Sequence, residues 1–205
     1  MTMIERISVA LSQAWVGAGI VDGEDESLYR YGLELLFSTA INIVLIAIIS
    51  IAFGHPWAFL PYLISFMPLR SFAGGYHAKT HWLCILVSAG LYTISLLTVI
   101  LMNLEENVIG CIVVGVVVVI ATWVLAPVSS ENKPLSAFER RRSRRISRGI
   151  AASLMAMDVI FAMARVTDYL VVRMFVCGEV IAMVLLITEY MNAQNDKRKQ
   201  CEETM

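Results

Sequence analysis

The stretch from Val108 to Val128 reads VIGCIVVGVVVVIATWVLAPV and contains no charged residue. An α-helix needs about 20 consecutive apolar residues to cross the hydrocarbon core of a bilayer, and this stretch meets that requirement. The whole chain agrees, because 58% of its 205 residues are hydrophobic and 16% are charged, with a mean hydropathy of +0.71. Soluble domains are about a quarter charged. The sequence therefore predicts an all-α integral membrane protein and argues against a soluble globule.

Similar apolar blocks lie on both sides of this stretch and together predict about six transmembrane helices. The blocks are Leu35–Phe53, Trp57–Leu69, Trp82–Met102, Val108–Val128, Gly149–Ala164 and Tyr169–Met191. The second block is short and contains Pro61 and Pro68, so on hydropathy alone it could be a re-entrant segment. The distribution of charge decides between a crossing and a re-entrant segment.

Basic residues gather on one side of the predicted bundle. If all six blocks cross and the N-terminus is inside, every Lys and Arg except Arg165 and Arg173 lies in an inner segment. This is the distribution that the positive-inside rule describes. A re-entrant second block would put the six arginines of Arg140–Arg148 outside. We therefore expect six crossings, with both termini in the cytoplasm.

The segments outside the blocks complete a single polytopic membrane domain over residues 1–205. Residues 1–20 carry apolar side chains at helical spacing, with Ser8 and Ser12 on the polar side, and predict an amphipathic helix. Residues 129–148 are expected to form a basic cytoplasmic linker, and residues 192–205 a cytoplasmic tail. The pattern of a removable signal peptide is absent from the N-terminal stretch. The four cysteines are widely spaced and suggest no disulfide framework.

The linker between the second and third blocks carries the residues with the most chemistry. It reads RSFAGGYHAKTHWLC from Arg70 to Cys84 and holds two of the three histidines. Three interpretations are open. His77, His81 and Cys84 could hold a metal ion from one helix face, a histidine could activate Cys84 as a nucleophile, or these residues have only interfacial and packing roles.

Helix geometry limits which histidine can reach Cys84. On an unbroken helix His77 would lie about 10 Å from Cys84 along the axis, too far for direct proton transfer. The Gly74–Gly75 pair loosens the backbone, and Thr80 is a suitable N-cap for the next span, which leaves His77 in a loop able to fold back. Cys84 would then lie near a helix N-terminus, where the helix dipole favours a thiolate. His81, three residues before Cys84, competes as the base.

These residues resemble a known family, accessory gene regulator B, whose members are membrane cysteine endopeptidases that process quorum-sensing pro-peptides in Gram-positive bacteria. The match includes Arg70 and the arrangement G-x-H-A-x-[S/T]-x-x-x-C over residues 75–84. It extends to Tyr31–Glu34 before the first span and to Ala126–Pro127 and Asn132–Pro134 after the fourth. The order of spans and the basic linker fit too, so the resemblance covers nearly the whole chain.

The resemblance implies that Cys84 is the nucleophile and His77 its general base, with His81 not required. The implied substrate is an AgrD-like pro-peptide, which is cut near the start of its acidic C-terminal tail. The resulting thioester on Cys84 is then attacked by a cysteine or serine of the peptide, which closes a thiolactone or lactone ring. Active sites of this kind use no metal or cofactor, and the resemblance also suggests a homodimer surrounded by membrane lipid. No nucleic-acid partner is expected.

Four further residues are candidates for substrate binding or for support of the catalytic dyad formed by Cys84 and His77. Arg70 or Lys79 could bind carboxylates of the substrate, although Arg70 could also act only as an anchor at the membrane face. Gly75 belongs to the central motif. Glu34 could orient His77, as carboxylates do for histidines in other catalytic sites.

A rival hypothesis from another functional class rests on ionisable residues within or near the apolar blocks. Asp158, Arg173 and Glu179 occupy such positions, where charge is costly and frequently functional. They could line the path of a small peptide or solute exporter. In an exporter, replacement of Cys84 would be tolerated and replacement of Asp158 or Glu179 would not.

Overall fold

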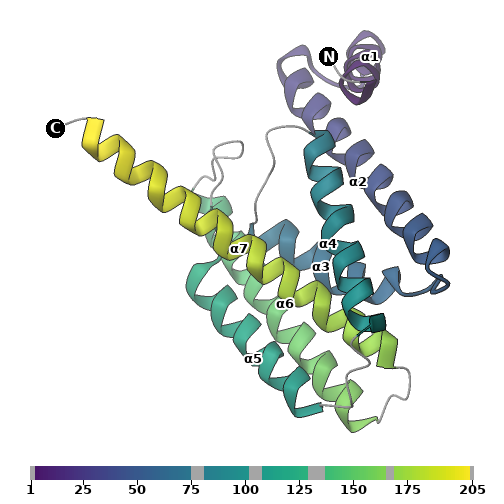
Figure 1. Ribbon diagram of the computed structural model, residues 1–205. Coiled ribbons are helices and arrows are strands. Elements are labelled where there is room, and N and C mark those ends of the chain that lie inside the picture. Colours follow the sequence, from purple (N-terminus) through teal and green to yellow (C-terminus); the bar gives the residue numbers. More distant parts are fainter. Residues whose placement is uncertain (1–2, 75–80, 102–107, 129–136, 165–168, 204–205) are drawn as a thin grey trace.

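Seven α-helices and one 3₁₀ turn make up the described part of the chain (Figure 1). The computed structural model describes residues 3–74, 81–101, 108–128, 137–164 and 169–203. The helices are α1 Met3–Gly17, α2 Glu26–Ala52, α3 Phe59–Ala73, α4 His81–Leu101, α5 Val108–Leu125, α6 Ala137–Met163 and α7 Tyr169–Glu203, with the turn η1 at Gly23–Asp25. No strand occurs within these ranges, which confirms the predicted all-α class.

Four of the helices are long and apolar enough to cross a membrane. The candidate spans are Gly23–Ala52, Trp82–Leu101, Phe138–Met163 and Tyr169–Asn195. Helix α3 is shorter, with 15 residues. The apolar part of α5, Gly110–Leu125, is also shorter than these four. At a rise of 1.5 Å per residue, 15 residues extend about 22 Å, less than the roughly 30 Å of a hydrocarbon core. Helix length and composition thus support four spans, and the count of six stays a prediction.

Two segments predicted to flank the spans are themselves helical. Helix α6 begins at Ala137, so the arginines of Arg140–Arg148 form its first turns and continue directly into the apolar part. Helix α7 likewise continues beyond Met191, through most of the predicted tail, to Glu203. Arginine, lysine and glutamine are good helix formers. No break in helical propensity therefore separates these polar segments from the spans.

The N-terminal helix α1 packs against α2, but not through the predicted apolar face. Its buried side chains are Ile4, Ser8 and Ser12, whereas Ile7 is 45% exposed. The sequence pattern assigns both serines to the polar side of this helix. Small side chains allow two helices to approach closely, which accounts for serines at a helix contact. The amphipathic surface helix is therefore not confirmed.

Helix α7 runs through the middle of the bundle and contacts α3, α4, α5 and α6 (Figure 1). Its closest approach is to α3 at Gly178, where an added Cβ would lie 2.6 Å from the backbone oxygen of Tyr62. Nearby, the Ser65 hydroxyl donates a hydrogen bond of 2.7 Å to the backbone oxygen of Phe175. Glycine at position 178 is therefore a requirement of the α3–α7 contact.

We expect Gly178→Ala to destabilise the bundle by about 1–3 kcal/mol, the usual effect of overpacking a core. Gly90→Ala is the matched control, because Gly90 is also helical and an added Cβ there meets nothing within 4 Å. Thermal unfolding in detergent, followed by size-exclusion chromatography, compares the two variants. Equal melting temperatures of the two variants would show that the stability of the α3–α7 packing does not depend on this close approach.

The residues of the exporter hypothesis occupy the α6–α7 side of the bundle. Asp158 and Glu179 are 2% and 1% exposed, and among the described residues their buried carboxyl oxygens have no hydrogen-bond partner. Arg173 instead lies over the ring of Tyr169, with 5.9 Å between the guanidinium carbon and the ring centre. The structure therefore buries the two acids and places Arg173 on an aromatic ring.

Candidate active site

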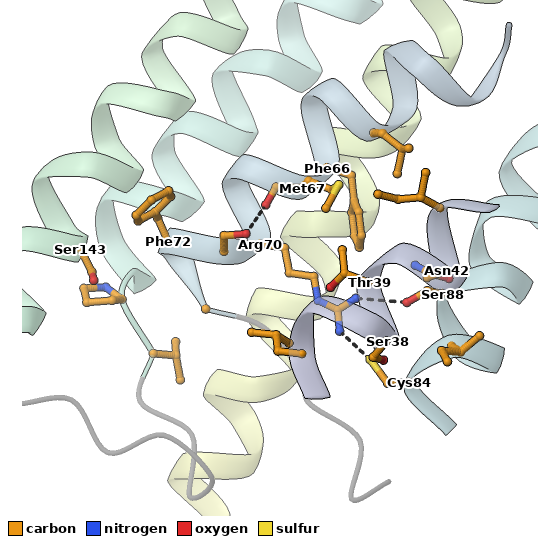
Figure 2. A pocket seen from close by; sticks show the side chains of 18 of the residues that line it. Ser38, Thr39, Asn42, Phe66, Met67, Arg70, Phe72, Cys84, Ser88 and Ser143 are labelled. Atoms are coloured by element: carbon orange, nitrogen blue, oxygen red, sulfur yellow. Dashed lines mark hydrogen bonds between the residues drawn. The ribbon is translucent and has the colours of Figure 1, made fainter. Parts of the chain in front are cut away.

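A cavity of about 310 Å³ opens between α2, α3 and α4 and is closed on a further side by residues 127–128 (Figure 2). Its lining includes Arg70 and Cys84, two residues that the sequence singles out. Ligand sites typically measure roughly 300–1,000 Å³. The cavity is therefore large enough for a short segment of a ligand, and it contains a thiol.

Cys84 lies in the first turn of α4, which begins at His81. The first four backbone N–H groups of a helix lack partners within the helix, and the helix dipole is positive at this end. Both effects stabilise negative charge near the sulfur. The predicted cap at Thr80 lies outside the described residues and stays a prediction.

The guanidinium group of Arg70, in the last turn of α3, connects α3 to α4. One terminal nitrogen donates to the Sγ of Cys84 at 3.2 Å, and the other donates to the Oγ of Ser88 at 3.2 Å (Figure 2). The same group lies 5.4 Å from the centre of the Phe66 ring. Three contacts therefore fix the guanidinium beside the sulfur.

Several predicted site residues fall outside the part of the chain that the structure describes. These are Gly75, His77 and Lys79. The geometry of the His77–Cys84 dyad therefore stays a prediction, as does the three-ligand metal hypothesis that includes His77. Glu34 is described, and its carboxylate lies 3.8 Å from the guanidinium of Arg30 within α2. It is not among the residues that line the cavity.

Sequence reasoning missed the polar residues that α2 and α4 bring to the cavity. They are Ser38, Thr39 and Asn42 on α2 and Ser88 on α4. A signal was available, because Tyr31, Ser38 and Asn42 recur at about two-turn and one-turn spacing within an otherwise apolar block. Spacing indicates that they share a helix face, but it does not indicate what that face contacts.

A short segment after α5 forms another wall of the cavity. Pro127 and Val128 line it, and the backbone N–H of Val128 donates to the backbone oxygen of Ala73 at 3.1 Å. Gly74 has a φ of +88°, and a Cβ at this position would lie 2.7 Å from the backbone oxygen of Val128. Gly74 is therefore required both by its backbone conformation and by the close approach of this wall.

Arg148 differs from the rest of the arginine cluster because it is tied to α5. Its guanidinium donates to the backbone oxygen of Trp123 at 3.0 Å and lies 5.0 Å from the centre of the Trp123 ring. The contact holds the last turn of α5, from which the wall formed by Pro127 and Val128 continues. Arg148 is thus part of the structural support of the cavity.

We expect Gly74→Ala to lower stability more than Gly54→Ala. Both glycines have positive φ, at +88° and +79°, so both substitutions carry a backbone penalty of about 1–2 kcal/mol. Only the Cβ at position 74 also meets the wall, since nothing lies within 4 Å at position 54. Thermal unfolding of both variants measures the difference. Equal losses would argue against a tight contact between Gly74 and Val128.

The fold and the cavity define a helical membrane protein with a thiol-containing site. Comparison with known proteins identifies it further: residues 4–191 match the family model described as accessory gene regulator B, and the chain belongs to this family. It is 28% identical over 154 residues to an AgrB-like protein of Clostridium perfringens strain SM101, covering 72% of this chain and 70% of that protein.

Two further relatives support this assignment. A second AgrB-like protein, from Clostridium perfringens strain 13, is 26% identical over 152 residues, with 72% of this chain and 70% of the relative covered. FsrB of Enterococcus faecalis is 36% identical over 85 residues, which cover 38% of this chain and 35% of FsrB. No solved structure matches the chain.

Proposed function

We propose that this protein is a membrane-embedded cysteine endopeptidase that removes the C-terminal tail of an AgrD-like pro-peptide and promotes ring closure of a quorum-sensing signal peptide. The observation that carries the proposal is the contact of Arg70 with the sulfur of Cys84 at the start of α4, inside a cavity. A cation and a helix N-terminus together favour the nucleophilic thiolate. Membership of the accessory gene regulator B family supports the choice of substrate.

The first chemical step is attack of the Cys84 sulfur on the carbonyl carbon of the scissile peptide bond. His77 accepts the thiol proton, and the oxyanion forms near the backbone N–H groups of the first turn of α4, which can donate to it. The C–N bond then breaks, and His77 returns the proton to the nitrogen of the departing tail. The remaining part of the peptide is held as a thioester on Cys84.

The second step closes the ring. A cysteine thiol or serine hydroxyl within the peptide attacks the thioester carbonyl and gives its proton to His77. The bond to Cys84 breaks, which releases a thiolactone or lactone and regenerates the thiol. Hydrolysis would dissipate the acyl energy, so the reaction requires that water be excluded, and a cavity between membrane helices provides this condition.

The acidic tail of the substrate has a suitable position beside the cavity. Ser143 lines the cavity and belongs to the first turns of α6, between Arg142 and Arg144. The basic border formed by Arg140–Arg145 complements an acidic tail and attracts it at long range. We propose that Arg70 and Lys79 assist there, with Gly75 and Glu34 in supporting roles. The positive-inside rule then assigns this end of the bundle to the cytoplasm.

Reconstitution in liposomes tests the proposal. The substrate is an AgrD-like pro-peptide with an acidic C-terminal tail, and products are identified by mass spectrometry. We expect wild type and His81→Ala to release the tail and His77→Ala to release none. A pro-peptide whose ring-forming residue is replaced by alanine should accumulate as a covalent adduct on Cys84 that hydroxylamine removes. Absence of both tail release and adduct with wild type would overturn the proposal.

The exporter hypothesis has one observation in its favour, the burial of Asp158 and Glu179. Neither residue lines the cavity that contains Cys84. We therefore expect Asp158→Asn to leave tail release by the reconstituted protein within about threefold of wild type, since side chains remote from a site have small effects on it. Loss of cleavage in Asp158→Asn at unchanged stability would contradict this expectation and give Asp158 a role in the peptidase reaction.

A further inference from the structure

One face of α2 presents neutral polar groups to the cavity that contains Cys84. Ser38, Thr39 and Asn42 all line it, and all three belong to an otherwise largely aliphatic helix. Ser38 is 7% exposed. Figure 2 shows these side chains in the same cavity as the Arg70 guanidinium and Ser88. We refer to Ser38, Thr39 and Asn42 as the polar strip.

Several hydroxyl groups elsewhere in the apolar helices are satisfied within their own helix. They donate to the backbone oxygen four residues earlier, as Thr93 does to Ala89 and Thr188 to Val184, both at 2.8 Å. Ser95, Thr98 and Ser153 do the same. This is the ordinary way in which a lone hydroxyl is accommodated in a membrane helix.

The polar strip contains a buried polar group that is not satisfied in this way. Within the ranges that the structure describes, the buried Oδ1 of Asn42 has no hydrogen-bond partner. Buried polar groups are nearly always hydrogen-bonded, and those that are not require an explanation. Since Asn42 lines the cavity together with Ser38 and Thr39, a ligand in that cavity can supply a partner for Oδ1 and contact the two hydroxyls.

The chemistry of the strip selects the kind of ligand. It carries two hydroxyls and one carboxamide, which both donate and accept hydrogen bonds and have no charge. A phosphate or a lipid headgroup would call for cations, and the polar strip itself carries none. A peptide main chain, with neutral N–H and C=O groups at every residue, matches the strip.

We propose that Ser38, Thr39 and Asn42 bind the main chain of the pro-peptide next to the bond that Cys84 attacks. This inference rests on the proposed peptidase function and adds the residues that recognise the substrate. Main-chain binding holds the scissile carbonyl against the sulfur and does not depend on the side chains of the pro-peptide. It also fills the cavity with groups other than water.

Steady-state kinetics of Ser38→Ala, Thr39→Val and Asn42→Leu with the pro-peptide tests the inference. We expect each variant to raise KM about three- to tenfold with kcat within about twofold of wild type, because the lost hydrogen bonds form equally in the bound substrate and the transition state. Thr93→Val is the matched control, since its hydroxyl bonds within α4. An unchanged KM in all three strip variants, or an equal rise in Thr93→Val, would overturn the inference.

A second measurement uses the substrate instead of the protein. Replacing one amide of the pro-peptide by an ester, at successive positions before the scissile bond, removes one main-chain N–H at a time. We expect an ester at one position to raise the KM of wild type. The same ester should raise the KM of Asn42→Leu by at most half as many fold. Additive effects at every position would overturn the inference. Wild type and Cys84→Ala, measured alongside, report on the peptidase function separately.

Discussion

Cys84→Ala will abolish release of the pro-peptide tail, with a fall in rate of about 10⁴-fold or more, the scale expected when a covalent nucleophile is removed. Among the described residues, the sulfur is the only thiol that lines the cavity, and Arg70 donates a hydrogen bond to it. Alanine removes the atom that forms the thioester, so neither cleavage nor ring closure can proceed. Cleavage by the reconstituted variant, measured by mass spectrometry against wild type, checks the prediction.

Two other cysteines provide matched controls for this variant. Cys111 and Cys177 are partly buried free thiols on α5 and α7, and neither lines the cavity. Cys111→Ala and Cys177→Ala should retain cleavage within about threefold of wild type, since each only removes a small apolar contact. If Cys84→Ala were to cleave at the wild-type rate, the covalent mechanism would be wrong. Size-exclusion chromatography excludes misfolding as the cause of a loss.

Arg70→Lys will lower the rate of cleavage by about tenfold to a hundredfold, and Arg70→Ala by about a hundredfold to a thousandfold. Lysine keeps the charge but loses the planar fork that donates to Cys84 and Ser88 together while it stacks on Phe66. Loss of the fork leaves the sulfur without its fixed cation. Most of the effect should appear in kcat, because the cation acts on the attacking thiolate.

A control for Arg70 separates the hydrogen bond to Cys84 from the hydrogen bond to Ser88. Ser88→Ala removes one acceptor and leaves the hydrogen bond to Cys84, so we expect a loss of only about two- to fivefold. Alkylation of Cys84 by iodoacetamide gives a readout that is independent of substrate, and Arg70→Ala should slow it more than Ser88→Ala does. Equal alkylation rates in wild type and Arg70→Ala would mean that the guanidinium does not activate the sulfur.

The helical class and the importance of Arg70 and Cys84 are readable from the sequence, because apolar block length and a local motif carry them. The contact between these two residues is not, since it depends on how α3 and α4 are rotated about their axes. The same limit hides the polar strip of α2 and the burial of Ser8 and Ser12. A pattern within one helix predicts a face, and only the packing of two helices decides what that face meets.

The number of membrane spans is the property that the sequence predicts least well. Charge distribution favours six crossings, but the 15 residues of α3 are too few for a full crossing by length alone. Helix boundaries were also missed at Arg140–Arg148, because a basic segment with good helix formers can continue a span as readily as it can end one.

The cavity has one consequence for divergence within the family. Its nucleophile, its arginine and its polar strip come from residues before α5, whereas the wall at Pro127 and Val128 and the basic border at Ser143 come from residues after the start of α5. The two halves of the gene thus encode different properties of one pocket. Under the proposed function, recombination between relatives at the α4–α5 junction would keep Cys84, Arg70 and the polar strip together. It would exchange the part of the pocket proposed to meet the departing tail, so the range of pro-peptides accepted would change while the proposed catalytic residues stayed together.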